Sequence, residues 1–346
     1  MSTPSPAAAG ARQENNAPLP ANYALDQYRI ERKLSMGGFS IVYLAYDEAG
    51  TPYAIKEYLP NSLALRAEGE ITPGIPEEHL PAFRYGMKCF FEEGRALARL
   101  NHPNIIRVVN FFRANSTVYM VMEFVNGSTM QEYIRNQCGR ISERFIRTVF
   151  MRLLNGLREV HTHKLLHLDI KPANIYLRED FNPVLLDFGA ARQALNQDEP
   201  MLKPMHTPGY ASPEHYGDNQ HLLGPWSDIY SIGAAMYACV TDRAPPRADE
   251  RVEKDTYKPL ADSIYLEKYS PQLLKIIDNC LNLDTLARPQ SVYALQKALV
   301  DHSKTPKTPP NEFITPAAND AVFEVPKVED LAPWQAGLHN KLKRII

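Results

Sequence analysis

The most informative part of the chain reads His167-Leu168-Asp169-Ile170-Lys171-Pro172-Ala173-Asn174, and it is followed after Leu185-Leu186 by Asp187-Phe188-Gly189. Phosphoryl transfer needs a carboxylate that accepts the proton of an attacking hydroxyl, together with oxygen ligands for Mg²⁺ beside the phosphates. Asp169, Asn174 and Asp187 supply these parts. Because Asp169 and Asn174 share a loop, one can face the nucleophile and the other the metal, while Lys171 neutralises charge on the moving phosphoryl group.

Length and charge narrow the class of protein. The 346 residues carry a formal net charge of −2, which gives no electrostatic reason to expect a nucleic acid or an anionic membrane as partner. The longest uncharged apolar run, 229–240, is far shorter than the ~20 residues of a membrane-spanning helix. The four cysteines are scattered without metal-site spacing, so we expect reduced thiols and a cytoplasmic protein. These features leave the oligomeric state open.

The distribution of apolar residues predicts an α+β protein with two lobes. Short β-branched and aromatic segments indicate one antiparallel sheet, at 28–34, 41–46, 52–58, 106–112 and 117–124. One helix interrupts them, with apolar side chains every three or four positions from Phe83 to Leu100. Further helices are expected at 129–137, 143–163, 226–241, 271–282 and 291–301. We therefore predict one domain over 25–302, with a small sheet lobe at 25–125 and a larger helical lobe at 126–302.

Both ends of the chain have the composition of disordered segments. Residues 1–24 are rich in Ala, Pro, Ser and Asn without apolar periodicity, so they cannot repay the entropy of ordering. Residues 303–346 form a Pro- and Thr-rich tail or linker in which prolines interrupt any helix. A segment at 59–80 is longer than most loops, which favours either a lid or docking element or a harmless surface insertion.

Three features of the predicted sheet lobe suit a nucleotide. A turn rich in small residues, from Leu34 through Gly37 and Gly38 to Val42, lets backbone N–H groups approach phosphates, although an ordinary hairpin has the same composition. Lys56 lies on an apolar strand, where an ammonium group needs an anionic partner. Glu93 shares a helix face with apolar residues, so its carboxylate points inward and can serve as that partner.

These motifs together resemble the eukaryotic-like protein kinase family, and especially its bacterial serine/threonine members. The resemblance spans about 28–302. It rests on the Gly-Gly-Phe loop, Ala54-Ile55-Lys56, Glu93, His102-Pro103-Asn104-Ile105, the Asp169 and Asp187 loops, Thr207-Pro208-Gly209-Tyr210-Ala211-Ser212-Pro213-Glu214, Asp228-Ile229-Tyr230-Ser231-Ile232-Gly233, and Arg288.

The resemblance implies a role for each motif residue. Lys56 would contact the α- and β-phosphates and pair with Glu93, Asp169 would be the catalytic base assisted by Lys171, and Asn174 and Asp187 would ligate Mg²⁺. The ATP-binding residues would be Leu34, Gly37, Gly38, Val42, Ala54, Lys56, Met122, Glu123 and Val125, with Met122 as gatekeeper and the backbones of Glu123 and Val125 holding adenine. Glu214 would pair with Arg288 to hold the substrate-binding loop.

The sequence departs from the family pattern at two places. Ser35 and Ser40 replace the outer glycines of the phosphate loop, and serine lacks the access of glycine to positive φ. Leu168 stands where many kinases carry an arginine that pairs with a phosphorylated activation loop. Between Asp187 and Glu214 the only hydroxyl side chains are Thr207, Tyr210 and Ser212. We therefore expect activity without phosphorylation of this loop.

The resulting expectation is a protein kinase that transfers the γ-phosphoryl group of ATP to Ser or Thr hydroxyls of protein substrates. Lys171 and Thr207 are typical of the serine/threonine branch. Ala173 and Thr129 occupy places that are acidic in kinases selecting basic substrates, so no preference for arginine is expected. A nucleotide-binding pseudokinase is one alternative, although such proteins commonly lose residues kept here. A small-molecule phosphotransferase is another, although Glu214 and Arg288 favour a polypeptide platform.

Overall fold

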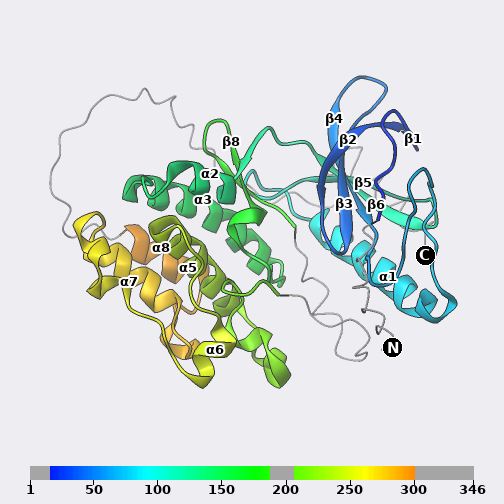
Figure 1. Ribbon diagram of the computed structural model, residues 1–346. Coiled ribbons are helices and arrows are strands. Elements are labelled where there is room, and N and C mark those ends of the chain that lie inside the picture. The colour runs from blue at the N-terminus through cyan, green and yellow to red at the C-terminus, as the bar shows by residue number, and fades with distance from the viewer. Residues whose placement is uncertain (1–15, 188–205, 301–346) are drawn as a thin grey trace, which may run out of the picture. The chain divides into compact units, whose positions relative to one another are not determined.

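The computed structural model describes residues 16–187 and 206–300, which Figure 1 shows in colour. The disorder expected for 1–15 and the tail expected at 303–346 lie outside the described residues. Within these residues a sheet lobe comes first and a helical lobe follows, so the prediction of an α+β, two-lobed fold is confirmed.

The sheet lobe is built on a six-stranded antiparallel sheet, within the described residues, in the order β1-β2-β3-β4-β6-β5. Its elements are β1 (Ala24–Leu25), β2 (Tyr28–Met36), β3 (Ser40–Tyr46), β4 (Pro52–Tyr58), α1 (Leu80–Leu97), β5 (Val108–Ala114) and β6 (Thr117–Glu123). Side chains alternate along a strand, so Lys56 points to one face of β4 and Glu57 to the other. The direct cross-strand partners of Lys56 are Val42 and Met120, which therefore share its face.

Helix α1 packs closely against the sheet because glycines face it at two points (Figure 1). A Cβ atom at Gly86 would stand 1.9 Å from the Tyr58 hydroxyl, and one at Gly94 would stand 1.8 Å from the Phe111 ring. A side chain at either position would push the helix off the sheet. Since Glu93 directly precedes Gly94, the same packing holds its carboxylate against the sheet.

Residues 16–24 are ordered, which corrects the prediction of disorder across 1–24. Asn16 and Leu19 are only 2% and 4% exposed. The Nδ2 group of Asn16 donates to the Ala64 carbonyl at 3.1 Å, and the Leu19 N–H donates to the Tyr43 hydroxyl at 3.1 Å. Composition was misleading because the docking is made by the buried side chains of Asn16 and Leu19 and by backbone hydrogen bonds of Ala17 and Asn22, and none of these produces a periodic pattern.

The long segment between β4 and α1 is also folded against the sheet. Leu65 and Gly74 form an antiparallel bridge, and a 3-10 helix at Glu77–His79 leads into α1. Arg66 is 1% exposed. The segment is therefore an integral part of the sheet lobe.

The helical lobe carries the two loops that contain the acidic motif residues. Its helices are α2 (Met130–Gln137), α3 (Glu143–Thr162), α5 (Pro225–Thr241), α6 (Ala248–Glu253), α7 (Pro271–Cys280) and α8 (Val292–Val300), and the antiparallel strands β7 (Gly127–Thr129), β8 (Ile175–Arg178) and β9 (Pro183–Leu185) form a second sheet. Further 3-10 helices occupy Pro172–Asn174, Pro213–His215, Gly217–Leu222, Leu260–Asp262, Ile264–Glu267 and Thr285–Ala287. The Asp169 loop precedes β8 and Asp187 follows β9, so pairing of β8 with β9 brings the two loops together.

The five helices predicted for the helical lobe agree with the structure to within two residues at their ends, and the apolar pattern from Phe83 to Leu100 begins and ends three residues later than α1. Several short elements were not expected. These are β1, β7, β8, β9, α6 and the 3-10 helices. Each is too short to show a full hydrophobic period, so no pattern marks it in the sequence.

Candidate active site

The residues expected to bind adenine line one face of the sheet lobe and the segment that follows it. Val42 and Ala54 are half-buried on β3 and β4, and Met122 is the direct partner of Ala54 on β6. Leu34 is half-buried near the end of β2, and Val125 is buried just beyond β6. The strand pairing therefore places Val42, Ala54 and Met122 on the face that carries Lys56. Glu123, at the end of β6, donates its backbone N–H to the Arg107 carbonyl at 3.0 Å.

The glycine-containing turn between β2 and β3 is fastened from one side and open on the other. The carbonyl of Gly38 accepts the Asn61 N–H at 2.9 Å, and the Gly37 N–H donates to the Ser40 carbonyl at 2.9 Å. A Cβ atom at Gly37 or Gly38 would meet nothing within 4 Å. Open space beside exposed backbone is what a loop that covers phosphates requires.

Lys56 lies between two carboxylates contributed by different lobes. Its Nζ atom is 3.9 Å from Glu93 Oε1 on α1 and is in direct contact with Oδ1 of Asp187. Lys56 and Glu93 are 8% and 1% exposed. Because burying an unpaired charge is costly, each of these charges needs the other nearby. Phe90 packs its ring 5.6 Å from the ammonium group.

Asp187 is held in an unusual backbone conformation. Its φ of 57° lies in the left-handed region, which non-glycine residues adopt at a cost. Desolvation alone would raise the pKa of its carboxyl, but the adjacent Lys56 ammonium outweighs this and holds the pKa below its ordinary value. Asp187 is therefore ionised and can receive a cation.

The carboxylate of Asp169 is oriented by three side chains. Lys171 Nζ and Asn174 Nδ2 donate to Oδ2 at 2.8 and 3.0 Å, and the Thr207 hydroxyl donates to Oδ1 at 2.9 Å. Lys171 also donates to the Thr207 hydroxyl at 2.8 Å. The structure thus joins the Asp169 loop to the segment around Thr207, and it fixes the atom that would receive a proton.

A buried carboxylate that the sequence reasoning gave no role anchors this loop from below. Asp228, on α5, is fully buried and accepts the backbone N–H groups of His167 and Leu168 at 2.9 and 2.7 Å. His161 lies 2.8 Å from the same carboxylate. Burial raises the pKa of the Asp228 carboxyl. The hydrogen bond and charge of His161, together with the charge and backbone N–H of His167, outweigh burial and hold the pKa below its ordinary value.

His167 connects the Asp169 loop to the Asp187 loop. Its Nδ1 atom accepts the Asp169 N–H at 3.3 Å, so Nε2 carries the proton and donates to the Leu186 carbonyl at 3.0 Å. Burial lowers the pKa of this imidazole and keeps it neutral. The two loops are therefore locked in register by one histidine.

Comparison with known proteins decides the family. The model of the protein kinase domain matches residues 28–300, which is more than half of the chain. The chain belongs to the protein kinase family. The expected family is thus confirmed, together with its two-lobed fold.

Several relatives of this kinase are known. The solved structure "PpkA-294 apo form" is 34% identical, with a TM-score of 0.72, and covers 82% of this chain and 99% of that chain. The PknI kinase domain of M. tuberculosis is 18% identical with a TM-score of 0.58 over 83% of this chain and 99% of that chain, a likeness of fold.

Curated relatives include serine/threonine-protein kinase PLK4 of Drosophila virilis, 26% identical over 64% of this chain and 26% of the relative, and PLK4 of Danio rerio, 26% identical over 80% and 27%. The chain spans about a quarter of the length of these curated relatives.

A buried ion pair holds the segment that carries Glu214. Arg288 donates through both terminal nitrogens to Glu214, at 2.8 and 3.0 Å, and the two residues are 2% exposed. Arg288 also donates to the carbonyls of Asn282 and Leu283 at 2.7 and 3.0 Å. Every donor of the guanidinium fork is directed by its surroundings, so the pair specifies geometry at this loop.

Some functional groups of the kinase escaped the sequence reasoning. Asp228 lies far from the Asp169 loop in the sequence, and His161, six residues before His167, is of a residue type that does not by itself indicate an anchor. Tyr176, whose hydroxyl donates to the Gly127 carbonyl at 3.0 Å, packs against the same buried cluster around Val125 as Met122 does. Its position directly after Asn174-Ile175 was the only available signal.

The described part of the kinase contains no helix long and apolar enough to cross a bilayer. All four cysteines are free thiols, as expected. Three of them are buried, whereas Cys138 is exposed.

Proposed function

We propose that this protein transfers the γ-phosphoryl group of ATP to serine or threonine hydroxyls of protein substrates. The observation that carries the proposal is the oriented carboxylate of Asp169, which lies in one site with the Lys56, Glu93 and Asp187 cluster. Family membership implies ATP as phosphoryl donor and a divalent metal ion.

In this proposal Asp169 acts as the base. The substrate hydroxyl loses its proton to the Asp169 carboxylate, its oxygen bonds to the γ-phosphorus, and the bond from that phosphorus to the departing ADP oxygen breaks. Lys171 lies 2.8 Å from the same carboxylate and stabilises the negative charge on the phosphoryl group. Lys56 holds the α- and β-phosphates, and Glu93 keeps its ammonium group in place.

Adenine would occupy the apolar face described above. Val42, Ala54 and Met122 would contact the ring, and the backbones of Glu123 and Val125 would bond its edge. Leu34, Gly37 and Gly38 would cover the ribose and phosphates. Leu34, Val42, Ala54, Met122 and Glu123 are half-buried, and the space beside Gly37 and Gly38 is open, which supports a nucleotide on this face.

Mg²⁺ is the metal that the donor set fits best. The Asn174 amide nitrogen is engaged by the carbonyl and carboxylate of Asp169, which leaves its amide oxygen available, and Asp187 supplies a carboxylate. Among the described residues no group of three or more His, Cys, Asp or Glu side chains can hold a metal. Mg²⁺ commonly takes one or two protein ligands and completes its shell with phosphate and water oxygens, so this pair suffices. When bound, the ion neutralises charge on the phosphates.

We further propose that activity does not depend on phosphorylation of the activation loop. Leu168 is 4% exposed and adopts a φ of 59°, and its carbonyl accepts a hydrogen bond from His215 at 3.1 Å. An apolar side chain at this place provides no cation for a phosphate. Phosphatase treatment should therefore leave the rate unchanged. A loss of activity that rephosphorylation of Thr207 or Ser212 restores would contradict this.

The proposed chemistry is tested with Asp169→Ala. Radiolabel transfer from ATP to a generic protein substrate should fall by about 10²–10⁴-fold, since a positioned base contributes that much. Glu253→Ala, at an exposed position on α6, is the matched control and should retain full activity.

Other results of this assay point to other functions. Nucleotide binding without any transfer by the unaltered protein would indicate a pseudokinase, and transfer only to small hydroxylated molecules would indicate a small-molecule phosphotransferase. Undiminished transfer by the Asp169→Ala variant would show that a contaminating kinase was measured.

We also propose a cytoplasmic location, supported by the free cysteines.

A further inference from the structure

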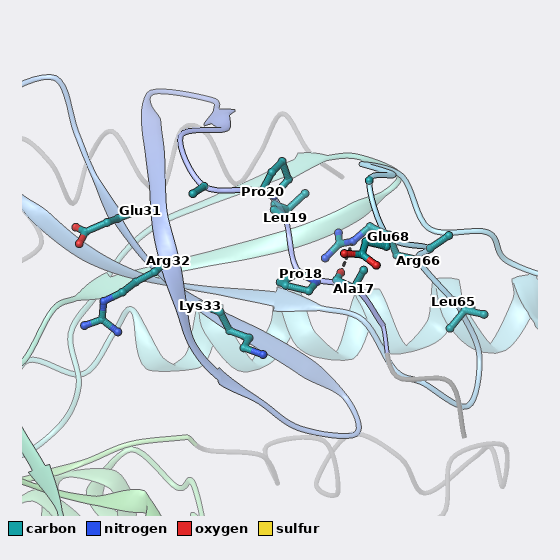
Figure 2. A pocket seen from close by; sticks show the side chains of 13 residues that line it. Ala17, Pro18, Leu19, Pro20, Glu31, Arg32, Lys33, Leu65, Arg66 and Glu68 are labelled. Carbon is teal, nitrogen blue, oxygen red and sulfur yellow. Dashed lines mark hydrogen bonds between the residues drawn. The ribbon is translucent and has the colours of Figure 1, made fainter. Parts of the chain in front are cut away.

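Residues 16–21, which we call the strap, lie before the part of the chain that the family model matches. Beyond them, residues 22–25 attach to β2: the Asn22 N–H donates to the Ile30 carbonyl at 2.7 Å, and Ala24 and Leu25 pair with Arg29 and Tyr28. The strap itself stands off from β2, because residues 17–21, 31–33 and 65–69 line a groove of about 1020 Å³ (Figure 2). Its attachment to the lobe must therefore come from elsewhere.

Besides the contacts of Asn16 with Ala64 and of Leu19 with Tyr43, the strap is attached to Arg66. The backbone of Ala17 donates to the Arg66 carbonyl at 2.9 Å and accepts from Arg66 Nε at 2.8 Å, a bond drawn in Figure 2. Asn16 accepts the Arg66 N–H through its side-chain oxygen at 2.5 Å. Strap and arginine are thus joined by three hydrogen bonds and form one unit.

Arg66 in turn grips the strand that carries Lys56. Its terminal nitrogens donate to the two oxygens of Glu57 at 2.6 and 2.8 Å, and both side chains are fully enclosed. The same carboxylate accepts hydroxyl groups from Tyr43 on β3 and Tyr119 on β6, each at 2.7 Å. Since Glu57 is the immediate neighbour of Lys56, this cluster fixes β4 against the strands on both sides.

Asn16 reaches the phosphate loop by a second route. Its Nδ2 atom donates to the Asn61 side-chain oxygen at 2.7 Å, and the Asn61 backbone N–H donates to the Gly38 carbonyl at 2.9 Å. The Leu59 N–H donates to the Phe39 carbonyl at 2.9 Å in the same way. The side of the glycine turn that faces away from the open space is therefore held by the segment to which the strap is tied.

We propose that Asn16 and Arg66 are positioning residues for ATP, acting through Glu57 and Asn61 on the Lys56 ammonium group and on the glycine turn. Neither residue is among those expected to contact ATP. The strap fixes the distance between Lys56 and Glu93 by tying β4 to the segment that enters α1. This inference rests on the proposed kinase function and adds to it a part of the chain outside the matched domain.

The decisive measurement is ATP affinity in a double-mutant cycle, with Arg66→Met, Glu93→Gln and the double variant. If Arg66 acts through the Lys56–Glu93 pair, Arg66→Met should weaken ATP binding by about tenfold in the unaltered background and by less than about threefold beside Glu93→Gln. Titration of a fluorescent ATP analogue reports this without turnover. Equal effects in both backgrounds, or none, would overturn the proposal.

Matched variants separate positioning from loss of folding. Arg32→Met, at an exposed position that lines the same groove, should leave ATP binding unchanged. Asn16→Ala keeps the Arg66–Glu57 pair and should weaken ATP binding by about threefold while the protein remains folded, as far-ultraviolet circular dichroism would verify. Were Arg66→Met to unfold, an unchanged ATP affinity in Asn16→Ala would by itself overturn the proposal.

The assay also distinguishes this inference from the proposed function. Phosphoryl transfer by the unaltered protein, combined with ATP affinity that is insensitive to Asn16 and Arg66, would reject the positioning role alone. Absence of phosphoryl transfer by the unaltered protein would reject the kinase function first.

Discussion

Two fully buried carboxylates, Glu57 in the sheet lobe and Asp228 in the helical lobe, hold the two halves of the site in different ways. Glu57 is neutralised by a permanent cation and by two tyrosine hydroxyls, all of them side chains. Asp228 instead accepts two backbone N–H groups and a histidine. The first carboxylate therefore aligns strands, whereas the second shapes a loop.

The contrast follows from what each lobe must do. The sheet lobe presents Lys56 on a regular strand, so it needs only that neighbouring strands keep their places. The helical lobe presents Asp169 from a loop without regular pairing, where the backbone groups themselves need a partner. Loss of Glu57 should therefore act mainly on stability, and loss of Asp228 mainly on catalysis.

The largest expected effect is that of Glu57→Gln. The change leaves the Arg66 guanidinium buried without its counter-charge, and breaking a buried pair in this way costs about 3–5 kcal/mol. Urea unfolding followed by fluorescence should report this loss, whereas Glu31→Gln on the exposed side of β2 should be neutral. A loss below about 1 kcal/mol would contradict the view of this cluster as the anchor of the lobe.

Asp228→Asn should act on the rate. One amide hydrogen would face the backbone donors of His167 and Leu168, which shifts the loop that carries Asp169, and a misplacement of about 1 Å costs roughly 100-fold in rate. We expect kcat to fall by about that factor while KM for ATP stays within about threefold, because the residues proposed to hold adenine lie in the sheet lobe. Asp262→Asn, at an exposed site, serves as control. A rise of KM for ATP as large as the fall of kcat would contradict the view that Asp228 acts on catalysis and not on ATP binding.

Tyr119→Phe tests whether Glu57 remains stable with fewer hydrogen-bond donors. The substitution removes one hydroxyl donor from Glu57 but leaves Arg66 and Tyr43, so the expected loss is about 1.5 kcal/mol, the worth of a hydrogen bond to a charged group. Urea unfolding again provides the measurement. A loss as large as that of Glu57→Gln would show that the partners act as one unit.

The smallest expected effect is on the pH dependence of stability. It involves His215 in the helical lobe, whereas the Glu57 cluster of the sheet lobe should not contribute. His215 lies under the catalytic loop, where Nε2 donates to the Leu168 carbonyl and Nδ1 accepts the Ser212 hydroxyl at 2.9 Å. Burial is the main reason that its pKa lies below the ordinary value, and the charge of His206 acts in the same direction against Asp228 and Glu214.

A histidine with a lowered folded pKa binds its proton more readily in the unfolded chain, so it adds stability at neutral pH that is lost as pH falls below about 6.5. His215→Gln should therefore flatten the pH dependence of the unfolding free energy below neutral pH, as urea unfolding at pH 7 and at lower pH would show. In the Glu57 cluster the pKa of Arg66 is raised, since the hydrogen bond and charge of Glu57 outweigh desolvation, so that anchor does not titrate in this range.

Much of the fold and site was predictable because the informative residues are close in sequence or periodic. Asp169, Lys171 and Asn174 share one loop, and the structure joins their side chains by hydrogen bonds, while the roles that the resemblance implied for them stay predictions. The helix bearing Glu93 was readable from its apolar spacing, and the strand bearing Lys56 from its β-branched and aromatic residues.

The parts that were missed depend on single residues brought together over long distances. Asn16 and Arg66 lie on segments that read as disorder and as an insertion, and their value appears only when both meet beside Glu57. Asp228 belongs to a motif of the family but has no partner nearby in the sequence that would define its role. Burial of a charge is a property of the folded surroundings, which composition does not encode.

The strap also bears on where this domain begins. A boundary drawn at residue 28, where the family pattern starts, would keep every residue expected to touch ATP and would cut away Asn16 and Ala17. Such a shortened protein would keep the proposed catalytic and ATP-binding residues. It would lack the strap, which we propose positions Lys56 and the glycine turn. In this kinase, the part of the chain that matches the family therefore begins later than the part that packs as the sheet lobe.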